Sequence, residues 1–166
     1  MVDRSASTRR RSHPAMAENV NQPLVGKEGP PSTVHVDKAR IRQFAKAVGL
    51  TDPVYFDEAA AKAAGYPSLI APPTLPIAIG QDNEPGGGAM PAVKYDVRKL
   101  LHEGTEIIYD RPIFAGDVLT SKGMLKSIAT REGKNGVRTI YTMESAFYDQ
   151  QGKRVCALLL RISEGQ

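Results

Sequence analysis

Three long segments in the second half of the chain alternate apolar and polar residues, which is the pattern of half-buried β-strands. They cover residues 117–132, 136–149 and 153–163. The stretches "GKNG" and "QQG" separate them, and a Gly in such a stretch can adopt the positive φ of a tight turn. Long strands joined by tight turns form an antiparallel meander. The sequence therefore predicts a long antiparallel sheet in this half of the chain.

The first half of the chain begins with a short strand pattern at residues 32–37 and continues with helical patterns. A capping Asp37 and a terminating Gly49 bound the first helix. Its apolar positions have the spacing of one buried face, and they are Ile41, Phe44, Ala45 and Val48. Residues 57–65 predict a second short helix, and residues 74–81 the start of a buried central helix. Helices followed by a long antiparallel sheet indicate an α+β fold, with the sheet wrapped around the apolar helix.

The net charge of +4 is concentrated near the N-terminus. Residues 1–15 hold four arginines and one aspartate, so the remainder has a net charge of about +1. The basic character belongs to a tail, which argues against a nucleic-acid-binding protein. This stretch lacks the apolar core of a secretory signal, and Met16 is an alternative natural start. We expect residues 1–28 to be a disordered or weakly ordered basic tail and residues 29–166 to form a single domain.

Cysteine and histidine are scarce in this chain. Cys156 is the only cysteine, which excludes an intramolecular disulfide, and the three histidines are scattered, which argues against a zinc site. We therefore expect neither a metal nor another cofactor. No apolar run approaches the roughly 18 residues of a membrane helix. These features fit a reducing, cytoplasmic setting, with no nucleic acid and no membrane as partner.

Two stretches of the sequence carry a family likeness. The first runs from "KARIRQFAKAVG" through "DPVYFDEAAAKAAGY" to "IAPPT", and the second is "LLHEGTEIIYDRPIFAGDVLTSKGMLKSI". Together they resemble the MaoC-type hot-dog family over roughly residues 32–163, most closely its N-terminal, FAS1-like dehydratase branch. The helix–loop–helix motif with "IAPPT" is fairly specific, whereas "RPIFAGDVL" is shared more widely among hot-dog proteins. The resemblance implies a hot-dog fold, in which a long antiparallel sheet wraps around a central helix.

The resemblance also implies a catalytic pattern, from which this chain departs. Active members carry Asp, four intervening residues and then His after the first helix, and a Gly N–H before the central helix holds the thioester oxygen. Here the Asp position falls on Leu50, the His position on Tyr55 and the Gly position on Pro73. Leucine cannot titrate, the phenol of a tyrosine is a poor base at pH 7, and proline has no N–H. We therefore expect no catalytic residue at the family positions.

Asp52 and Tyr55 are the remaining candidates for a rearranged acid–base site. An Asp before Pro is also typical of a turn, because its carboxylate bonds to the backbone nearby. A tyrosine in this region can simply anchor its loop by packing. The candidates for substrate binding lie in the loop and just before the central helix, and they are Tyr55, Tyr66, Ala71, Pro73 and Thr74.

The missing reactive groups lead to a first hypothesis about function. It is a non-catalytic subunit of an (R)-specific enoyl-thioester hydratase or 3-hydroxyacyl-thioester dehydratase, which shapes the acyl tunnel for a catalytic partner. The expected partners are an acyl-CoA or acyl-ACP thioester and another hot-dog subunit, in a homo- or heterodimer. Two alternatives stay open, a self-sufficient homodimeric hydratase and an acyl-thioester binding module without a reaction. The sequence leaves open the acyl chain length, the carrier and the pathway.

Overall fold

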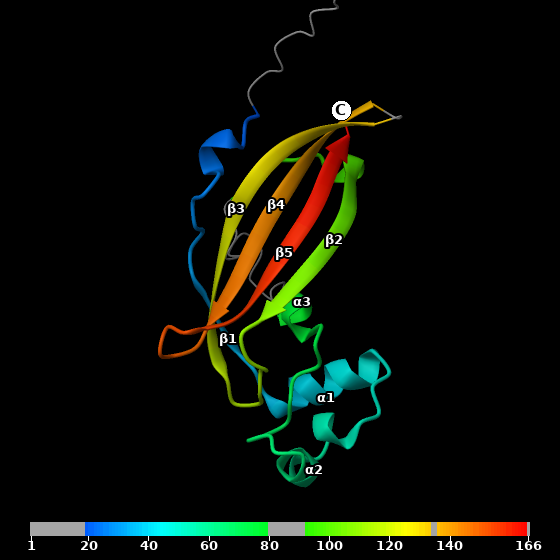
Figure 1. Ribbon diagram of the computed structural model, residues 1–166, viewed down its shortest axis with the longest axis vertical. Helices are drawn as coiled ribbons and strands as arrows, with labels where there is room; N and C mark the ends of the chain where they lie inside the picture. Colours follow the sequence, from blue (N-terminus) through cyan, green and yellow to red (C-terminus); the bar gives the residue numbers. More distant parts are fainter. Residues whose placement is uncertain (1–18, 80–91, 134–135, 166) are drawn as a thin grey trace, which may run out of the picture.

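The computed structural model describes residues 19–79, 92–133 and 136–165. Within them, five strands form one antiparallel sheet in the order β1-β3-β4-β5-β2 (Figure 1). The strands are β1 (Ser32–His35), β2 (Leu100–Tyr109), β3 (Val118–Gly133), β4 (Gly136–Tyr148) and β5 (Arg154–Gly165). The antiparallel meander predicted from the alternating segments is confirmed as β3-β4-β5.

The turns of the meander use glycines where the backbone requires positive φ. Gly136, where β4 begins, has a φ of 102°, and Gly152, between β4 and β5, has a φ of 76°. Only glycine takes such angles without a steric cost. The registers Leu125↔Met143 and Met143↔Leu160 then bring apolar side chains of three strands onto one face of the sheet.

Three short helices come before most of the sheet in the chain. They are α1 (Lys38–Ala47), α2 (Glu58–Ala63) and α3 (Leu75–Ile79). Asp37 caps α1, because its side chain accepts the N–H of Arg40 at 2.7 Å. The first two predicted helices are confirmed as α1 and α2. The predicted central helix begins at Leu75 as α3, and residues 80–81 of that prediction lie outside the described residues. None of the described helices is long and apolar enough to span a membrane.

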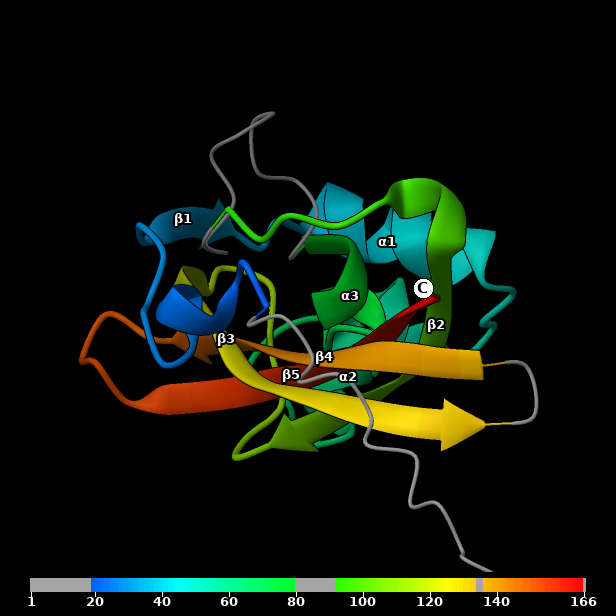
Figure 2. The same ribbon diagram turned by 90° about the horizontal axis from the view of Figure 1, so that it is seen from above.

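The sheet is curved and lies around α3. Seen from above, β1 lies on one side of α3 and β2 on the other, with the central strands below it (Figure 2). The apolar side chains of α3, Leu75 and Ile79, are fully buried. The predicted α+β fold with a sheet wrapped around an apolar helix is therefore confirmed.

Two groups of buried side chains fill the concave face of the sheet. The lower core lies beneath the helices and includes Ile41 of α1, Leu75 of α3 and Phe147 of β4. The upper core lies further along the strands and consists of Leu125, Tyr141, Met143 and Ile162 with their partly buried neighbours. The helices cover the lower core, so this end of the sheet carries the candidate functional residues.

The upper core is covered partly by residues 19–28, which the sequence analysis assigns to a disordered or weakly ordered tail. The structure places this segment along β3, where Gly26 N–H donates to the Leu125 carbonyl at 2.9 Å. Asn21 is fully buried, and its side-chain amide exchanges two hydrogen bonds with the backbone of Lys94, at 2.7 and 2.8 Å. Burial of apolar neighbours and these hydrogen bonds hold the segment in place. Residues 1–18 of the predicted tail lie outside the described residues.

Candidate functional site

The loop after α1 begins with a tight end of the helix. Gly49 has a φ of 77° and donates its N–H to the Lys46 carbonyl at 3.2 Å. Leu50 then donates its N–H to the Ala45 carbonyl at 2.9 Å, which completes the usual hydrogen-bond pair of a glycine-terminated helix. Leu50, at the family Asp position, is half-buried. Its backbone ends the helix, and its side chain has no proton to give or take.

Asp52 stands at the start of a single turn of 3-10 helix, η2 (Pro53–Tyr55). Its carboxylate accepts the N–H of Val54 at 3.1 Å, and its carbonyl accepts the N–H of Tyr55 at 3.2 Å. The side chain is exposed and is used as the cap of this turn, a use that Asp-Pro sequences favour. Its candidacy as a base stays a prediction.

Tyr55, at the family His position, is half-buried at the end of η2. Its hydroxyl makes no hydrogen bond within the part of the chain that the structure describes. The loop around it is tied to α1, because Arg42 Nε donates to the Phe56 carbonyl at 2.9 Å. A fixed loop thus carries a phenol without a partner among the described residues.

The segment before α3, residues 66–74, lies against the loop that follows β2, residues 110–117. Two backbone hydrogen bonds join them, from Ala71 N–H to the Ile113 carbonyl (2.8 Å) and from Ala115 N–H to the Leu69 carbonyl (2.9 Å). The ring of Tyr66 packs against Phe114 with centroids 6.0 Å apart. Tyr66 and Ala71, two of the predicted binding residues, are therefore held by the same loop.

An ion pair fixes that loop in turn. Arg111 donates two hydrogen bonds to the carboxylate of Asp117, at 2.8 and 3.2 Å. The same carboxylate accepts the N–H of Phe114 at 2.9 Å. Its hydrogen bonds to Arg111 raise the pKa of that guanidinium, so Arg111 stays positively charged. Arg111 and Asp117 thus bind each other within this loop, and its third charged side chain, Asp110, pairs with Arg154 of β5.

Pro73 and Thr74 are exposed and connect this segment to the edge of the sheet. The hydroxyl of Tyr109, the last residue of β2, donates to the carbonyl of Pro73 at 2.9 Å. Burial raises the pKa of the Tyr109 phenol, so it remains a protonated donor at neutral pH. The sequence analysis missed Tyr109, because no local pattern reveals which of two segments 36 residues apart will meet.

Four of the five predicted binding residues lie on one segment of the chain, and the fifth lies on another. Tyr66, Ala71, Pro73 and Thr74 follow one another along the segment before α3. Tyr55 and the alternative base Asp52 lie on the connection between α1 and α2. Among the described residues, no hydrogen bond joins either of these two to the segment before α3.

Cys156 and two histidines, the remaining candidate nucleophile and imidazoles among the described residues, lie on the strands. Burial raises the pKa of the Cys156 thiol to about 12, so it stays neutral and inert. His35 and His102 lie on β1 and β2, and His102 Nε2 is 2.9 Å from the hydroxyl of Thr105. Within the described ranges no three His, Cys, Asp or Glu side chains come together as metal ligands.

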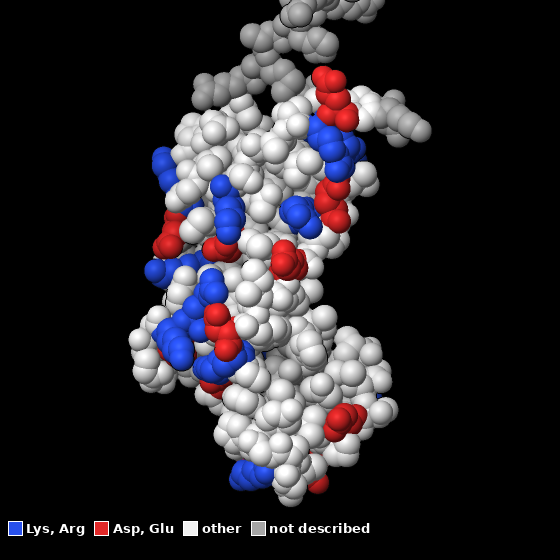
Figure 3. Space-filling model, viewed as in Figure 1, with Lys and Arg blue, Asp and Glu red and all other residues white. Residues whose placement is uncertain are grey.

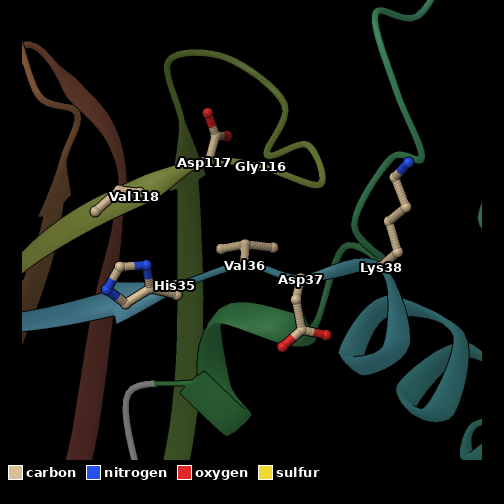
Figure 4. A pocket seen from close by; sticks show the side chains of 7 residues that line it. All are labelled: His35, Val36, Asp37, Lys38, Gly116, Asp117 and Val118. Carbon is tan, nitrogen blue, oxygen red and sulfur yellow. The ribbon is translucent and has the colours of Figure 1, made fainter.

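A shallow cavity of about 310 Å³ lies between β1, the start of α1 and the start of β3. Its lining includes Asp37, Lys38 and Asp117 (Figure 4). These three side chains point in different directions in Figure 4 and are already bonded elsewhere, to the N–H of Arg40, to Glu58 and to Arg111. The cavity therefore offers no converging set of polar groups for a ligand.

The convex face of the sheet carries both signs of charge. Lys and Arg side chains lie beside Asp and Glu on the face shown in Figure 3 instead of forming one dense basic patch. Charged side chains of the sheet also form ion pairs, such as Lys126–Glu144 at 2.6 Å and Arg154–Asp110 at 2.6 Å. The described residues on the face shown in Figure 3 therefore form no positive stripe of the kind that tracks a phosphate backbone.

Comparisons with known proteins agree with this architecture. A family model described as "FAS1-like, dehydratase domain region" matches residues 23–158. A UPF0336 protein of Streptomyces avermitilis is 33% identical over 144 residues, which cover 86% of this chain and 93% of that protein. The ChsH1-ChsH2 complex from Mycobacterium tuberculosis contains a chain with a TM-score of 0.68 and 19% identity, covering 83% of this chain and 84% of that chain. The C-terminally truncated HadBC (3R-hydroxyacyl-ACP dehydratase) complex from the same organism contains one with a TM-score of 0.62 and 22% identity, covering 82% and 92%.

Proposed function

The chain belongs to the family of FAS1-like dehydratase domain regions, and from this membership we propose that it is a non-catalytic subunit of an (R)-specific enoyl-thioester hydratase or 3-hydroxyacyl-thioester dehydratase. In this role the chain forms one wall of the acyl-binding site, and a second hot-dog subunit brings the acid and the base. The observation that carries the proposal is the replacement of all three reactive positions in a segment that is otherwise fully folded.

The reaction requires groups that these three positions do not supply. Hydration of an unsaturated thioester needs a base for the attacking water, an acid for the α-carbon and a donor for the thioester oxygen. Leu50 offers neither acid nor base, and Pro73 offers no N–H. Loss of one oxyanion donor alone typically lowers the rate by about 10²–10³. A chain with all three replacements is expected to contribute binding and shape to the reaction.

An apolar wall is a physically sensible contribution of such a subunit. The helix α3 is apolar, and the half-buried Tyr66 precedes it in the segment that packs on the loop after β2. A subunit without polar catalytic groups can contact an acyl chain without burying unpaired charges. Each methylene that leaves water contributes about 0.8 kcal/mol to binding.

The strand β2 supports the pairing that this proposal requires. In the described part of the chain it pairs with β5 on one side and with no strand on the other. Its side chains include Leu101, which is 57% exposed, and Ile108, which is 39% exposed. Unpaired strand edges readily bind another strand, and hot-dog domains join their sheets side by side. The ChsH1-ChsH2 and HadBC assemblies are named as complexes, which fits a chain that works with a partner.

Turnover assays on the purified chain and on a mixture test the proposal. The chain alone should not hydrate crotonyl-CoA or a longer enoyl-CoA. Activity should appear on mixing with a hot-dog subunit that carries Asp, four residues and then His after its first helix. In the mixture, Asp→Asn in that partner should abolish turnover, whereas Asp52→Asn in this chain should leave it within about twofold.

Activity of the chain on its own would overturn the proposal. Hydration of an enoyl-CoA by the homogeneous chain, lost in the Asp52→Asn or Tyr55→Phe variant, would assign the chemistry to this chain. Ile108→Lys in β2 provides a control on assembly. It should weaken association with the partner because it places a charge at the pairing edge, while unfolding of the isolated chain stays nearly unchanged.

A further inference from the structure

Three large apolar side chains are exposed close to the start of β2. Val97 is 72% exposed and lies in the 3-10 turn η3 (Val97–Lys99), which leads directly into the strand. Tyr95, just before this turn, is 39% exposed, and Val20 of the N-terminal segment is 65% exposed. We call these three residues the upper apolar surface. Exposed apolar side chains that lie together often mark a contact site.

Polar contacts hold the backbone that carries this surface. The fully buried Asn21 bonds to the N–H and the carbonyl of Lys94, at 2.8 and 2.7 Å. The N–H of Asp96 donates to the carboxylate of Glu164 on β5 at 2.6 Å. The first contact joins the segment before β2 to the N-terminal segment, and the two together anchor the chain on both sides of the exposed tyrosine.

The upper apolar surface lies on the same side of the sheet as α3. The ring of Tyr95 packs against that of Tyr141, with centroids 6.3 Å apart. Tyr141 belongs to the upper core on the concave face, which also faces α3. The segment that leads into β2 runs on the helical side of the central strands (Figure 2). The surface is therefore placed to meet groups that lie above the concave face of a neighbouring sheet.

The free edge of β2 determines which part of a neighbour it meets. Two subunits of one fold that join at the same edge are related by an approximate two-fold axis. If the axis is perpendicular to the sheet, the two edge strands are antiparallel and both concave faces lie on one side. The start of β2 then lies beside the end of the partner's edge strand. In this chain the end of β2 is Tyr109, which holds the segment before α3 through the Pro73 carbonyl.

We propose that the upper apolar surface contacts the segment before the central helix of the catalytic hot-dog subunit, and that Val97 limits the length of the acyl group bound there. The inference rests on the proposed function, which supplies the partner and the pairing at β2. It adds the side chains by which this chain selects the substrate. Val97 is the most exposed of the three and is continuous with the pairing strand.

The Val97→Trp variant tests the effect on the acyl group, and Thr33→Trp is its matched control. Thr33 is also exposed and has the shape of valine, but it lies on β1, at the opposite edge of the sheet. Each variant would be mixed with a subunit that carries Asp, four residues and then His after its first helix. We expect Val97→Trp to raise the Michaelis constant for trans-2-dodecenoyl-CoA about tenfold, the scale of overpacking, and that for crotonyl-CoA by less than about twofold. Thr33→Trp should change neither constant by more than about twofold.

A crosslinking experiment locates the contact without relying on activity. Cys156 is the only cysteine and is fully buried, and burial raises the pKa of its thiol to about 12. A thiol introduced by Val97→Cys is therefore the only one that reacts readily with a maleimide. A benzophenone maleimide attached there should crosslink to the catalytic subunit, in the peptide just before its central helix. The same label on Thr33→Cys should not reach that peptide.

The possible results separate this inference from the proposed function. Crosslinks from residue 97 to another part of the catalytic subunit, or to a second copy of this chain, would overturn the inference. Equal effects of Val97→Trp on the two enoyl-CoA substrates would overturn it as well. In each case the mixture of parent chains remains active, so the proposed function stands. An inactive parent mixture, or turnover of crotonyl-CoA by this chain alone, would instead overturn the proposed function and the inference with it.

Discussion

Two loops at the helical end of the sheet differ in what their side chains contribute to the fold. In the loop after β2, residues 110–117, the polar side chains serve the fold, since Arg111 and Asp117 bind each other and the carboxylate also holds the Phe114 N–H. In the loop after α1, residues 50–55, the two family acid–base positions hold Leu50 and Tyr55. The backbone N–H groups of Leu50, Val54 and Tyr55 in this second loop are nonetheless bonded, at the ends of α1 and η2.

The difference teaches that the fold of this site does not depend on its reactive side chains. Leu50 contributes its N–H to the end of α1, and any non-proline residue could do the same. Asp117, in contrast, contributes three hydrogen bonds through its side chain. The hydrogen bonds of this loop can therefore be kept whatever side chains stand at residues 50 and 55, whereas a change at residue 117 removes three of them.

The largest expected effect is that of Asp117→Ala. The change leaves the Arg111 guanidinium, only 30% exposed, without its main partner and leaves the Phe114 N–H unbonded. We expect the free energy of unfolding to fall by about 3 kcal/mol, the scale of a broken partly buried charged pair. Urea unfolding of the two chains would measure it.

Asp110→Ala is the matched control for that experiment. Asp110 also pairs with an arginine, Arg154, but both side chains are substantially exposed. Exposed ion pairs contribute little, so this variant should lose much less stability than Asp117→Ala. Equal losses in the two variants would show that the Arg111–Asp117 pair has no special structural importance.

A smaller effect is expected from the double change Leu50→Asp and Tyr55→His, which restores the family pair. The carboxylate would occupy a half-buried position, so we expect a loss of about 2 kcal/mol in urea unfolding. No turnover of crotonyl-CoA by this variant alone is expected, because Pro73 still lacks the N–H at the family position. A donor displaced by about 1 Å can cost about 100-fold in rate. Turnover by the double variant would show that the side chains at residues 50 and 55 alone account for the lack of activity, and that Pro73 does not prevent it.

The sequence was a good guide wherever the physical cause is local. Alternation over residues 136–149 predicted β4, and the caps Asp37 and Gly49 bounded α1, because turn angles and capping depend on near neighbours. The family and its hot-dog fold, suggested by the motifs around "DPVYF" and "RPIFAGD", are confirmed by the matching family model and relatives. The assignment of no catalytic group to residues 50 and 55 stays a prediction.

Contacts between distant segments could not be predicted from local patterns. Nothing near Tyr109 in the chain indicates that its hydroxyl meets the Pro73 carbonyl. Residues 19–28 were grouped with the tail by composition, yet Leu24 and Val25 pack against the upper core. Which partner a side chain finds depends on how the sheet curves, and a single sequence does not state this.

Asp52→Ala should have a smaller effect than Asp117→Ala or the double change at residues 50 and 55. It removes the cap of η2, where the carboxylate accepts the Val54 N–H at 3.1 Å, so we expect a loss of about 1 kcal/mol or less in urea unfolding. Activity of the mixture with a catalytic subunit should remain within about twofold of the parent. A large loss of activity with little loss of stability would assign chemistry to this carboxylate.

Tyr55→Phe should have the smallest effect, and it is the sharpest test of the contrast between the two loops. The hydroxyl of Tyr55 makes no hydrogen bond among the described residues, so its removal should change the free energy of unfolding by about 0.5 kcal/mol at most. If the loop after α1 only lines the acyl-binding site, the Michaelis constant and turnover number of the mixture should also stay within about twofold of those of the parent chain. A turnover number reduced about tenfold at unchanged stability would instead mean that the Tyr55 phenol takes part in the reaction, at the position where the family has an imidazole.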